Sequence, residues 1–340
     1  MNGAEALVRS LAGSGIDVCF TNPGTSEMHF VAALDRLDLI YCVLALQENV
    51  ATGAADGYAR MTGQPAATLL HLGPGFGNGL ANVHNAKKAR VPMINIVGEH
   101  ASYHIKYNAP LTSDIEAIVT PVSDYVVTSS HPDDVGTDAA RAVAQAKTWP
   151  GKIATMILPA DMAWSKTDIV GDGLLPDAPG RVVAEEVEAV AAALKSDKKA
   201  VMFCSGAVLI DPNLEKLGKV RAASGVDLIS QTSNRRIDRG AGRVVVDKLP
   251  YVVDLAIETL KDYDVIILVG TDEPVGFFAY PEKPSKLSPE GAEILRLAGP
   301  EQNTFEALDM LIDALDAKDL EVEVAAYEEA ADISKLSGPI

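Results

Sequence analysis

The sequence predicts an α/β protein with two doubly wound parallel-sheet domains, the second smaller than the first. Short, continuously apolar runs alternate with helical stretches along most of the chain. Strands that are apolar on both faces are typical of parallel sheets that helices cover on both sides. The length agrees, because 340 residues with 48% hydrophobic side chains provide enough apolar material for two domains of roughly 100–200 residues each.

The first domain is predicted to occupy residues 1–165, and Gly, Pro and Asp then mark 166–184 as a linker. The second, a smaller Rossmann-like domain, is predicted over 185–318, and the acidic stretch 319–340 is expected to be a connector. In the first domain we predict strands at 17–20, 41–46, 66–72, 93–98 and 154–159, with helices at 3–15, 26–36, 48–62, 77–90 and 132–148. In the second we predict strands at 200–206, 226–230 and 264–270, with helices at 185–195, 212–224, 250–260 and 303–316.

Charge and composition argue against several classes of partner. The formal net charge of −18 repels nucleic-acid phosphates and anionic lipid headgroups. We find no signal-peptide core and no apolar run of the ~18 residues that a membrane span needs, so we expect a cytoplasmic protein without nucleic-acid or membrane partners. Cys19, Cys42 and Cys204 lack metal-ligand spacing, and we expect buried, reduced thiols and no metal site built by this chain.

Three segments lie at the carboxyl ends of predicted strands, the edge where open α/β sheets bind ligands. The first is TNPGTSE over 21–27, in which Pro23 and Gly24 force a turn and Thr25 or Ser26 can cap the next helix. A plain connection between strand and helix explains this segment equally well.

The second segment, LQENV over 46–50, places Glu48 directly after an apolar strand. A partly desolvated carboxylate at that position can share a proton with a weakly basic ring nitrogen. A buried or capping glutamate is the commoner explanation for a single residue of this kind.

The third segment contains His71 followed by Gly73, Gly75, Gly77 and Gly79. We expect the segment from Gly73 to Asn78, which leads into the predicted helix, to be a loop whose backbone approaches a flat ligand closely. Its spacing fits neither the dinucleotide fingerprint nor the P-loop. His71, at the end of the predicted strand, is either a proton-transfer group or a satisfied core residue.

The combined order and spacing of these segments is more specific than any one of them. TNPGTSEMHF, LALQENVATGAADGYARMTGQPA, LHLGPGFGNGLANVHNAKKARVPMINIVGEH and LTSDIEAIVTPVSDYV occur in this order and spacing. They resemble the pyrimidine-binding domain of thiamine-diphosphate enzymes of the acetolactate synthase and benzoylformate decarboxylase type. The resemblance covers residues 1–165 strongly and 185–316 by general layout.

The resemblance implies a function for the named residues. Glu48 would hydrogen-bond the pyrimidine nitrogen N1′ of thiamine diphosphate and so activate the cofactor for decarboxylation or carboligation of a 2-oxo acid. His71 matches the decarboxylase branch, in which a histidine donates or accepts a proton. A second histidine of that branch has no counterpart near Ala279. The positions beside the cofactor and substrate would be Asn22, Pro23, Gly24, Thr25, Gly73 and Asn78.

The resemblance also implies partners. Enzymes of this type dimerise through the pyrimidine domain, so we expect a homodimer or tetramer with helix 50–62 at the contact. They carry a third domain whose Asp and Asn hold Mg²⁺ and the diphosphate. We expect that domain to be missing here, supplied by a separate chain or lost from a fragment, so that the 340-residue chain alone is inactive.

Two other functions are open at this point. The chain could be a non-catalytic regulatory or assembly subunit that retains the fold. It could also be an unrelated α/β protein that binds a nucleotide or a flavin, with Cys204–Leu209 as the contact.

Overall fold

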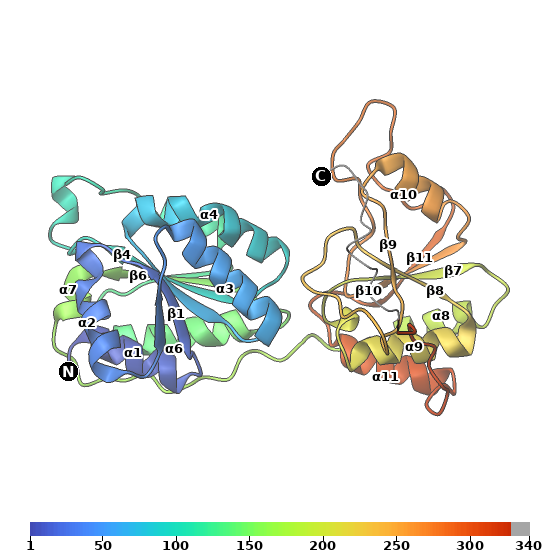
Figure 1. Ribbon diagram of the computed structural model, residues 1–340, viewed down its shortest axis with the longest axis horizontal. Helices are drawn as coiled ribbons and strands as arrows, with labels where there is room; N and C mark the ends of the chain where they lie inside the picture. Colours follow the sequence, from blue (N-terminus) through green and yellow to red (C-terminus); the bar gives the residue numbers. More distant parts are fainter. Residues whose placement is uncertain (328–340) are drawn as a thin grey trace, which may run out of the picture. The chain divides into compact units, whose positions relative to one another are not determined.

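The computed structural model describes residues 1–327, which form two compact α/β units (Figure 1). The first unit comprises Met1–Pro179 and the second begins at Gly180. Each contains one entirely parallel sheet, so the predicted fold class is confirmed. Across residues 1–327, no helix is both long enough and apolar enough to cross a bilayer.

The first unit is built on a six-stranded sheet in the order β2-β1-β3-β4-β6-β5. Its strands are Val18–Asn22 (β1), Tyr41–Leu44 (β2), Ala66–Leu70 (β3), Met93–Glu99 (β4), Tyr125–Thr128 (β5) and Ile153–Pro159 (β6). Its helices are Gly3–Gly13 (α1), Met28–Leu37 (α2), Glu48–Thr62 (α3), Leu72–Lys88 (α4), Ile115–Val119 (α5), Asp134–Lys147 (α6) and Ala160–Trp164 (α7), with short 3-10 helices at Thr25–Glu27, Ile105–Tyr107 and Thr120–Val122.

Two apolar cores sandwich this sheet. On one face α1, α2 and α6 pack on side chains such as Cys19, Leu69 and Ile96. On the other face α3, α4 and α5 pack on alternate residues of the same strands, such as Leu70 and Val97. Because side chains alternate between the two faces of a strand, both sets of strand residues must be apolar, which explains the continuous runs in the sequence.

The second unit has a five-stranded sheet in the order β11-β10-β7-β8-β9. Helices α8, α9 and α11 cover one face and α10 covers the other. The elements are Ala184–Leu194 (α8), Ala200–Cys204 (β7), a 3-10 helix at Gly206–Leu209, Asn213–Ser224 (α9), Asp227–Ser230 (β8), Asp247–Lys248 (β9), Val253–Leu260 (α10), Val265–Val269 (β10), Glu293–Ala298 (β11) and Thr304–Ala314 (α11).

The structure differs from the predicted elements at the start of α4 and in several short elements that were not predicted, among them α5 and α7. The helix predicted over 77–90 begins earlier, because α4 starts at Leu72, so residues 73–76 are helical and not part of a loop. A proline costs little in the first turn of a helix, and here it is Pro74. The strands β5, β9 and β11 were not predicted; β5 and β9 are short, and β11 is largely exposed.

The predicted linker and the described part of the connector lack helix and strand over most of their length, and both are hydrogen-bonded to the folded units. Gly171 donates its backbone N–H to Ser10 Oγ, and Asp177 donates to Thr148 Oγ1, so 166–179 lies along the first unit. Residues 319–327 lie without helix against α9 and the 242–243 backbone. The rest of the predicted connector, 328–340, lies outside the described residues.

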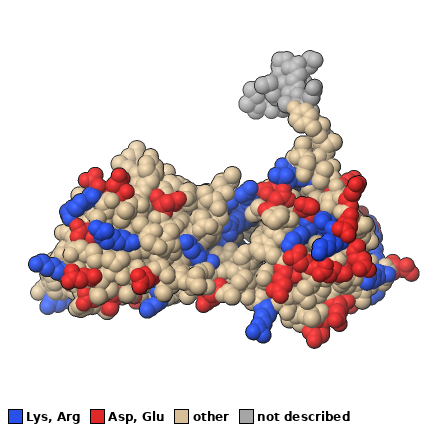
Figure 2. All heavy atoms as spheres, turned by 90° about the horizontal axis from the view of Figure 1, so that it is seen from below, with Lys and Arg blue, Asp and Glu red and all other residues tan. Residues whose placement is uncertain are grey.

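Two surface features bear on the sequence predictions. Cys42 is exposed, whereas Cys19 and Cys204 are buried. The prediction for Cys42 was wrong because β2 is the edge strand of its sheet, with only one neighbour to cover it. On the face drawn in Figure 2, Lys and Arg side chains are interspersed with Asp and Glu.

Candidate functional site

The sheet topology of the first unit brings the three candidate segments to one edge. Strand β1 pairs with β2 on one side and with β3 on the other. The turn after β1 therefore lies between the segment that carries Glu48, after β2, and the segment that begins at His71, after β3. Asn22 ties two of them together, since its side-chain amide donates to the backbone oxygen of Ala45 at 2.8 Å.

Glu48 is the first residue of α3, and the Gln47 side chain caps this helix by accepting from the N–H of Val50. Only 8% of Glu48 is exposed. Its Oε2 accepts a hydrogen bond of 3.0 Å from the Asn78 side-chain amide. Within residues 1–327 this is the one hydrogen bond that reaches the Glu48 carboxylate, so Oε1 keeps its capacity to bind a further donor.

The glycines at the start of α4 leave room beside this carboxylate. A Cβ on Gly75 would lie 3.1 Å from Glu48 Oε1, and a Cβ on Gly79 would lie 2.8 Å from Thr52 Cγ2. A Cβ on Gly73 would overlap Ser113 Oγ. At Gly75 and Gly79, helices α3 and α4 therefore approach so closely that larger residues would force them apart. The close approach brings the side-chain amide of Asn78 within hydrogen-bond distance of the Glu48 carboxylate.

His71 precedes α4 and lies against the turn after β1. Its Nδ1 is 2.7 Å from Oε2 of Glu27, and 27% of its side chain is exposed. A Cβ on Gly24 would overlap the His71 ring, so this turn position must be a glycine. The next residue, Leu72, is buried with φ of 52°, a left-handed conformation that is strained for leucine.

Glu27 is the polar residue of this edge that the sequence prediction missed. It is 3% exposed, and its Oε2 also accepts from the N–H of Gly24 at 2.7 Å. The spacing of three residues between Gly24 and Glu27 is the one local signal for this bond, since it is the spacing of a capping box. Pro23 and Thr25 lie within the same turn, Thr25 as the first residue of its 3-10 helix.

The predicted residues thus fall into two small groups along the edge. Glu48 and Asn78 form one, with Gly73 and Gly75 at the start of the same helix as Asn78. His71 and Glu27 form the other, with Gly24 between the ring and the turn. Among the described residues, no cluster of three or more His, Cys, Asp or Glu side chains could hold a metal ion.

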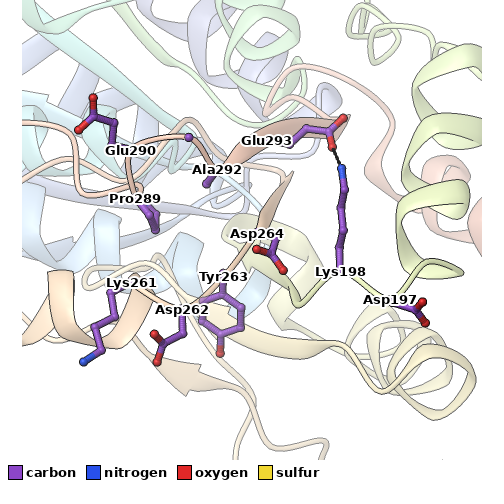
Figure 3. A pocket seen from close by; sticks show the side chains of 11 residues that line it. Asp197, Lys198, Lys261, Asp262, Tyr263, Asp264, Pro289, Glu290, Ala292 and Glu293 are labelled. Carbon is purple, nitrogen blue, oxygen red and sulfur yellow. Dashed lines mark hydrogen bonds and ion pairs between the residues drawn. The ribbon is translucent and has the colours of Figure 1, made fainter.

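A hollow of about 640 Å³ in the second unit lies elsewhere (Figure 3). Its lining residues precede β7 and β10 and surround the start of β11, and they include Asp264 and the ion pair of Lys198 with Glu293 at 2.7 Å. Parallel sheets of this kind bind ligands beyond the carboxyl ends of their strands. This hollow lies at the amino ends, so we assign no ligand to it.

Comparison with known proteins identifies relatives of both units. Residues 1–118 match the family described as "Thiamine pyrophosphate enzyme, N-terminal TPP binding domain". IlvX of Mycobacterium tuberculosis, provisionally named as an acetolactate synthase large subunit, is 48% identical over 300 residues, which cover 88% of this chain and 58% of IlvX. The acetolactate synthase large subunit of Corynebacterium glutamicum is 29% identical over 68% of this chain and 37% of its own.

Solved structures show the same fold. A Mycobacterium smegmatis protein, provisionally described as a thiamin diphosphate-dependent enzyme, superposes with a TM-score of 0.79 at 22% identity, over 96% of this chain and 65% of its own. The thiamine diphosphate-dependent 4-hydroxybenzoylformate decarboxylase of Rhodococcus jostii RHA1 superposes with a TM-score of 0.77 at 18% identity, over 97% of this chain and 66% of its own. The chain therefore spans less than two thirds of the length of these curated relatives and about two thirds of these solved chains.

Proposed function

We propose a function from one premise: the chain is a relative of the thiamine-diphosphate enzymes of the acetolactate synthase and decarboxylase type, as its motifs predict and the comparisons confirm. On this premise, the first unit holds the pyrimidine end of thiamine diphosphate in an enzyme that decarboxylates or carboligates a 2-oxo acid. The observation that carries the proposal is the Glu48 carboxylate, buried at the carboxyl edge of the sheet with one oxygen bound by Asn78.

The residues present fit such a cofactor. Only 8% of Glu48 is exposed, so few water molecules can compete with a ligand that binds its carboxylate. Oε1 of Glu48 has no donor among the described side chains and backbone groups, and Gly75 next to it presents no side chain. A flat, weakly basic ring with a nitrogen at its edge matches this combination of a carboxylate and open space.

The residues of this edge would divide the work. Glu48 would share a proton with pyrimidine nitrogen N1′ through Oε1, while Asn78 holds the other oxygen. Asn22, Pro23, Gly24 and Thr25 would shape the wall beside the ring, and His71 would donate or accept a proton at the substrate. When bound, thiamine diphosphate supplies the electron sink for cleaving the bond between the carboxylate and the carbonyl carbon of a 2-oxo acid.

Turnover would also require residues that bind the diphosphate end of the cofactor and its Mg²⁺. A diphosphate with its Mg²⁺ needs several oxygen ligands, and we assign them to a further domain, in the same polypeptide or in a separate chain. We also propose that the first unit forms a homodimer or a tetramer. Tyr41, Leu44, Leu46 and Val50 are exposed along β2 and the start of α3, and an apolar surface of this kind is typical of a subunit contact.

The test is the Glu48→Gln variant, assayed with 2-oxo acids after a diphosphate-binding domain has been supplied. Loss of the ionisable carboxyl removes the shared proton, so we expect kcat to fall by about 100-fold or more. Glu116→Gln, an exposed first-turn glutamate of α5, is the control and should retain activity. Full activity of Glu48→Gln would contradict the enzymatic role and favour a non-catalytic assembly subunit.

A further inference from the structure

We propose that Glu27 is the positioning residue for His71, fixing the ring in the tautomer that carries its proton on Nδ1 and presents Nε2 to the substrate. The inference rests on the proposed function for what the ring does, but not for the pairing itself. The pair joins residues 44 positions apart in the sequence, with Nδ1 of His71 and Oε2 of Glu27 2.7 Å apart.

The surroundings hold Glu27 in one place. The N–H of Gly24 donates to the same Oε2 at 2.7 Å, so the oxygen that faces His71 is also bound from the backbone. A Cβ on Gly98 of β4 would overlap Oε1, so this strand position must be a glycine to accommodate the carboxylate. Glu27 is 3% exposed, and such burial leaves the carboxylate few alternative positions.

The ring of His71 is held from the other side. It lies against Gly24, where a larger residue would overlap it, and it precedes Leu72, whose left-handed backbone directs the chain into α4. No other group within residues 1–327 hydrogen-bonds the ring, and 27% of the side chain remains exposed. Nε2 is therefore the nitrogen available to a ligand.

The chemistry of the pair follows from the donor and acceptor roles. A carboxylate accepts only, so neutral His71 must donate from Nδ1, and this leaves a lone pair on Nε2. When Nε2 takes up a proton, the carboxylate of Glu27 stabilises the positive ring, as in other pairs where a buried carboxylate orients a histidine. Glu27 acts through His71 and need not touch the substrate.

The experiment measures the tautomer directly, without cofactor or turnover. The full chain, with ¹⁵N-labelled histidine, is studied by two-bond ¹H–¹⁵N NMR at a pH where the ring is neutral, with His71→Asn to assign the signals. We expect the wild-type ring to be in the Nδ1–H form. In Glu27→Ala we expect most of the population to move to the Nε2–H form, which an imidazole without a partner favours.

Two matched variants separate positioning from a general structural effect. Glu27→Gln retains an oxygen for the Nδ1–H group and should restore the wild-type tautomer. Glu99→Gln changes another buried glutamate, at the end of β4, whose Oε1 accepts from the His100 N–H instead, and should leave His71 unchanged. If Glu27→Ala does not fold, the wild-type tautomer alone still decides, because an Nε2–H ring there overturns the inference.

The outcomes also separate this inference from the proposed function. If Glu27→Ala leaves the tautomer of His71 as in the wild type, the positioning role is wrong even when Glu48→Gln abolishes turnover. If the tautomer shifts but Glu48→Gln is fully active, the pairing is right and the enzymatic role is wrong. In the complete enzyme we expect Glu27→Ala to lower kcat by about 10-fold or more with little change in the KM of the 2-oxo acid.

Discussion

Asn78 donates its side-chain amide to the carboxylate of Glu48, from the second turn of α4 to the first residue of α3, over 3.0 Å. The bond crosses the contact at which glycines bring the two helices together. It orients a buried carboxylate that no other described group binds, so we regard it as the contact that fixes Glu48.

Replacing Asn78 by Ala tests this relationship. A hydrogen bond to a charged group contributes about 1.5–3 kcal/mol, so we expect turnover in the complete enzyme to fall by about 10- to 100-fold. Asn82→Ala is the matched control, because Asn82 also donates from α4 to α3, at 2.7 Å, but to the backbone oxygen of Asn49. Equal losses of turnover in the two variants would show that Asn78 supports only the packing of the helices.

The close contact of α3 with α4 predicts opposite effects for two glycines of α4. A Cβ on Gly79 would lie 2.8 Å from Thr52, whereas a Cβ on Gly77 would meet no atom within 4 Å. We expect Gly79→Ala to lower the free energy of unfolding by about 1–3 kcal/mol and Gly77→Ala to raise it by about 0.5–1 kcal/mol, since alanine favours helix. Urea denaturation measures both, and equal shifts would contradict the contact.

Local sequence signals predicted most of the framework. The helix predicted over 48–62 has these bounds in the structure, where Gln47 caps its start and Gly63 ends it in a left-handed conformation. Gly73 and Gly75 were wrongly assigned to a loop, because glycine disfavours helix in isolation. In the folded chain, glycines of α4 leave space for Thr52 and Glu48 of α3, and this tertiary contact explains why glycine occurs in the helix.

Glu27 could not be found by the same route. Its burial depends on the absence of a side chain at Gly98, 71 positions later, and its partner His71 arrives on a different strand. Neither relationship has a periodic signal in the sequence. Motif spacing did locate Glu48 and His71 at the carboxyl edge of the sheet, because strands end where apolar runs end, whereas the pairing of side chains there depends on the assembled fold.

The exposed apolar side chains along β2 and α3 predict the effect of a charge on assembly. Leu46, which precedes the N-cap residue Gln47 of α3, is 91% exposed. If this surface is a subunit contact, an aspartate there would be buried without a partner, so we expect Leu46→Asp to raise the dissociation constant by about 10-fold or more. Light scattering coupled to size-exclusion chromatography over a dilution series measures this change.

Leu175 provides the control for that experiment. It is 92% exposed in the extended segment after α7 and belongs to neither β2 nor α3. Leu175→Asp should therefore leave the oligomeric state unchanged. A monomeric wild-type chain, or an equal response of the two variants, would show that the β2 surface is not the contact.

Glu99 gives a prediction for pH dependence. Burial at the end of β4 raises the pKa of its carboxyl, against the opposing effect of the hydrogen bond from the His100 N–H. A carboxyl whose pKa is higher in the folded state binds its proton more tightly there than in the unfolded chain. Its contribution to the free energy of unfolding is therefore greatest below its ordinary pKa of 4.5 and falls as the pH rises through the folded-state value.

Glu99→Gln removes this titration and keeps an oxygen for the His100 N–H. We therefore expect the variant to gain stability relative to the wild type between pH 4 and pH 7, as Glu99 ionises in the wild type alone. Urea denaturation at several pH values measures the difference, and Glu116→Gln serves as the exposed control. A constant difference between Glu99→Gln and the wild type over this range would mean that the Glu99 carboxyl titrates alike in the folded and unfolded chain, because only an altered pKa makes that difference depend on pH.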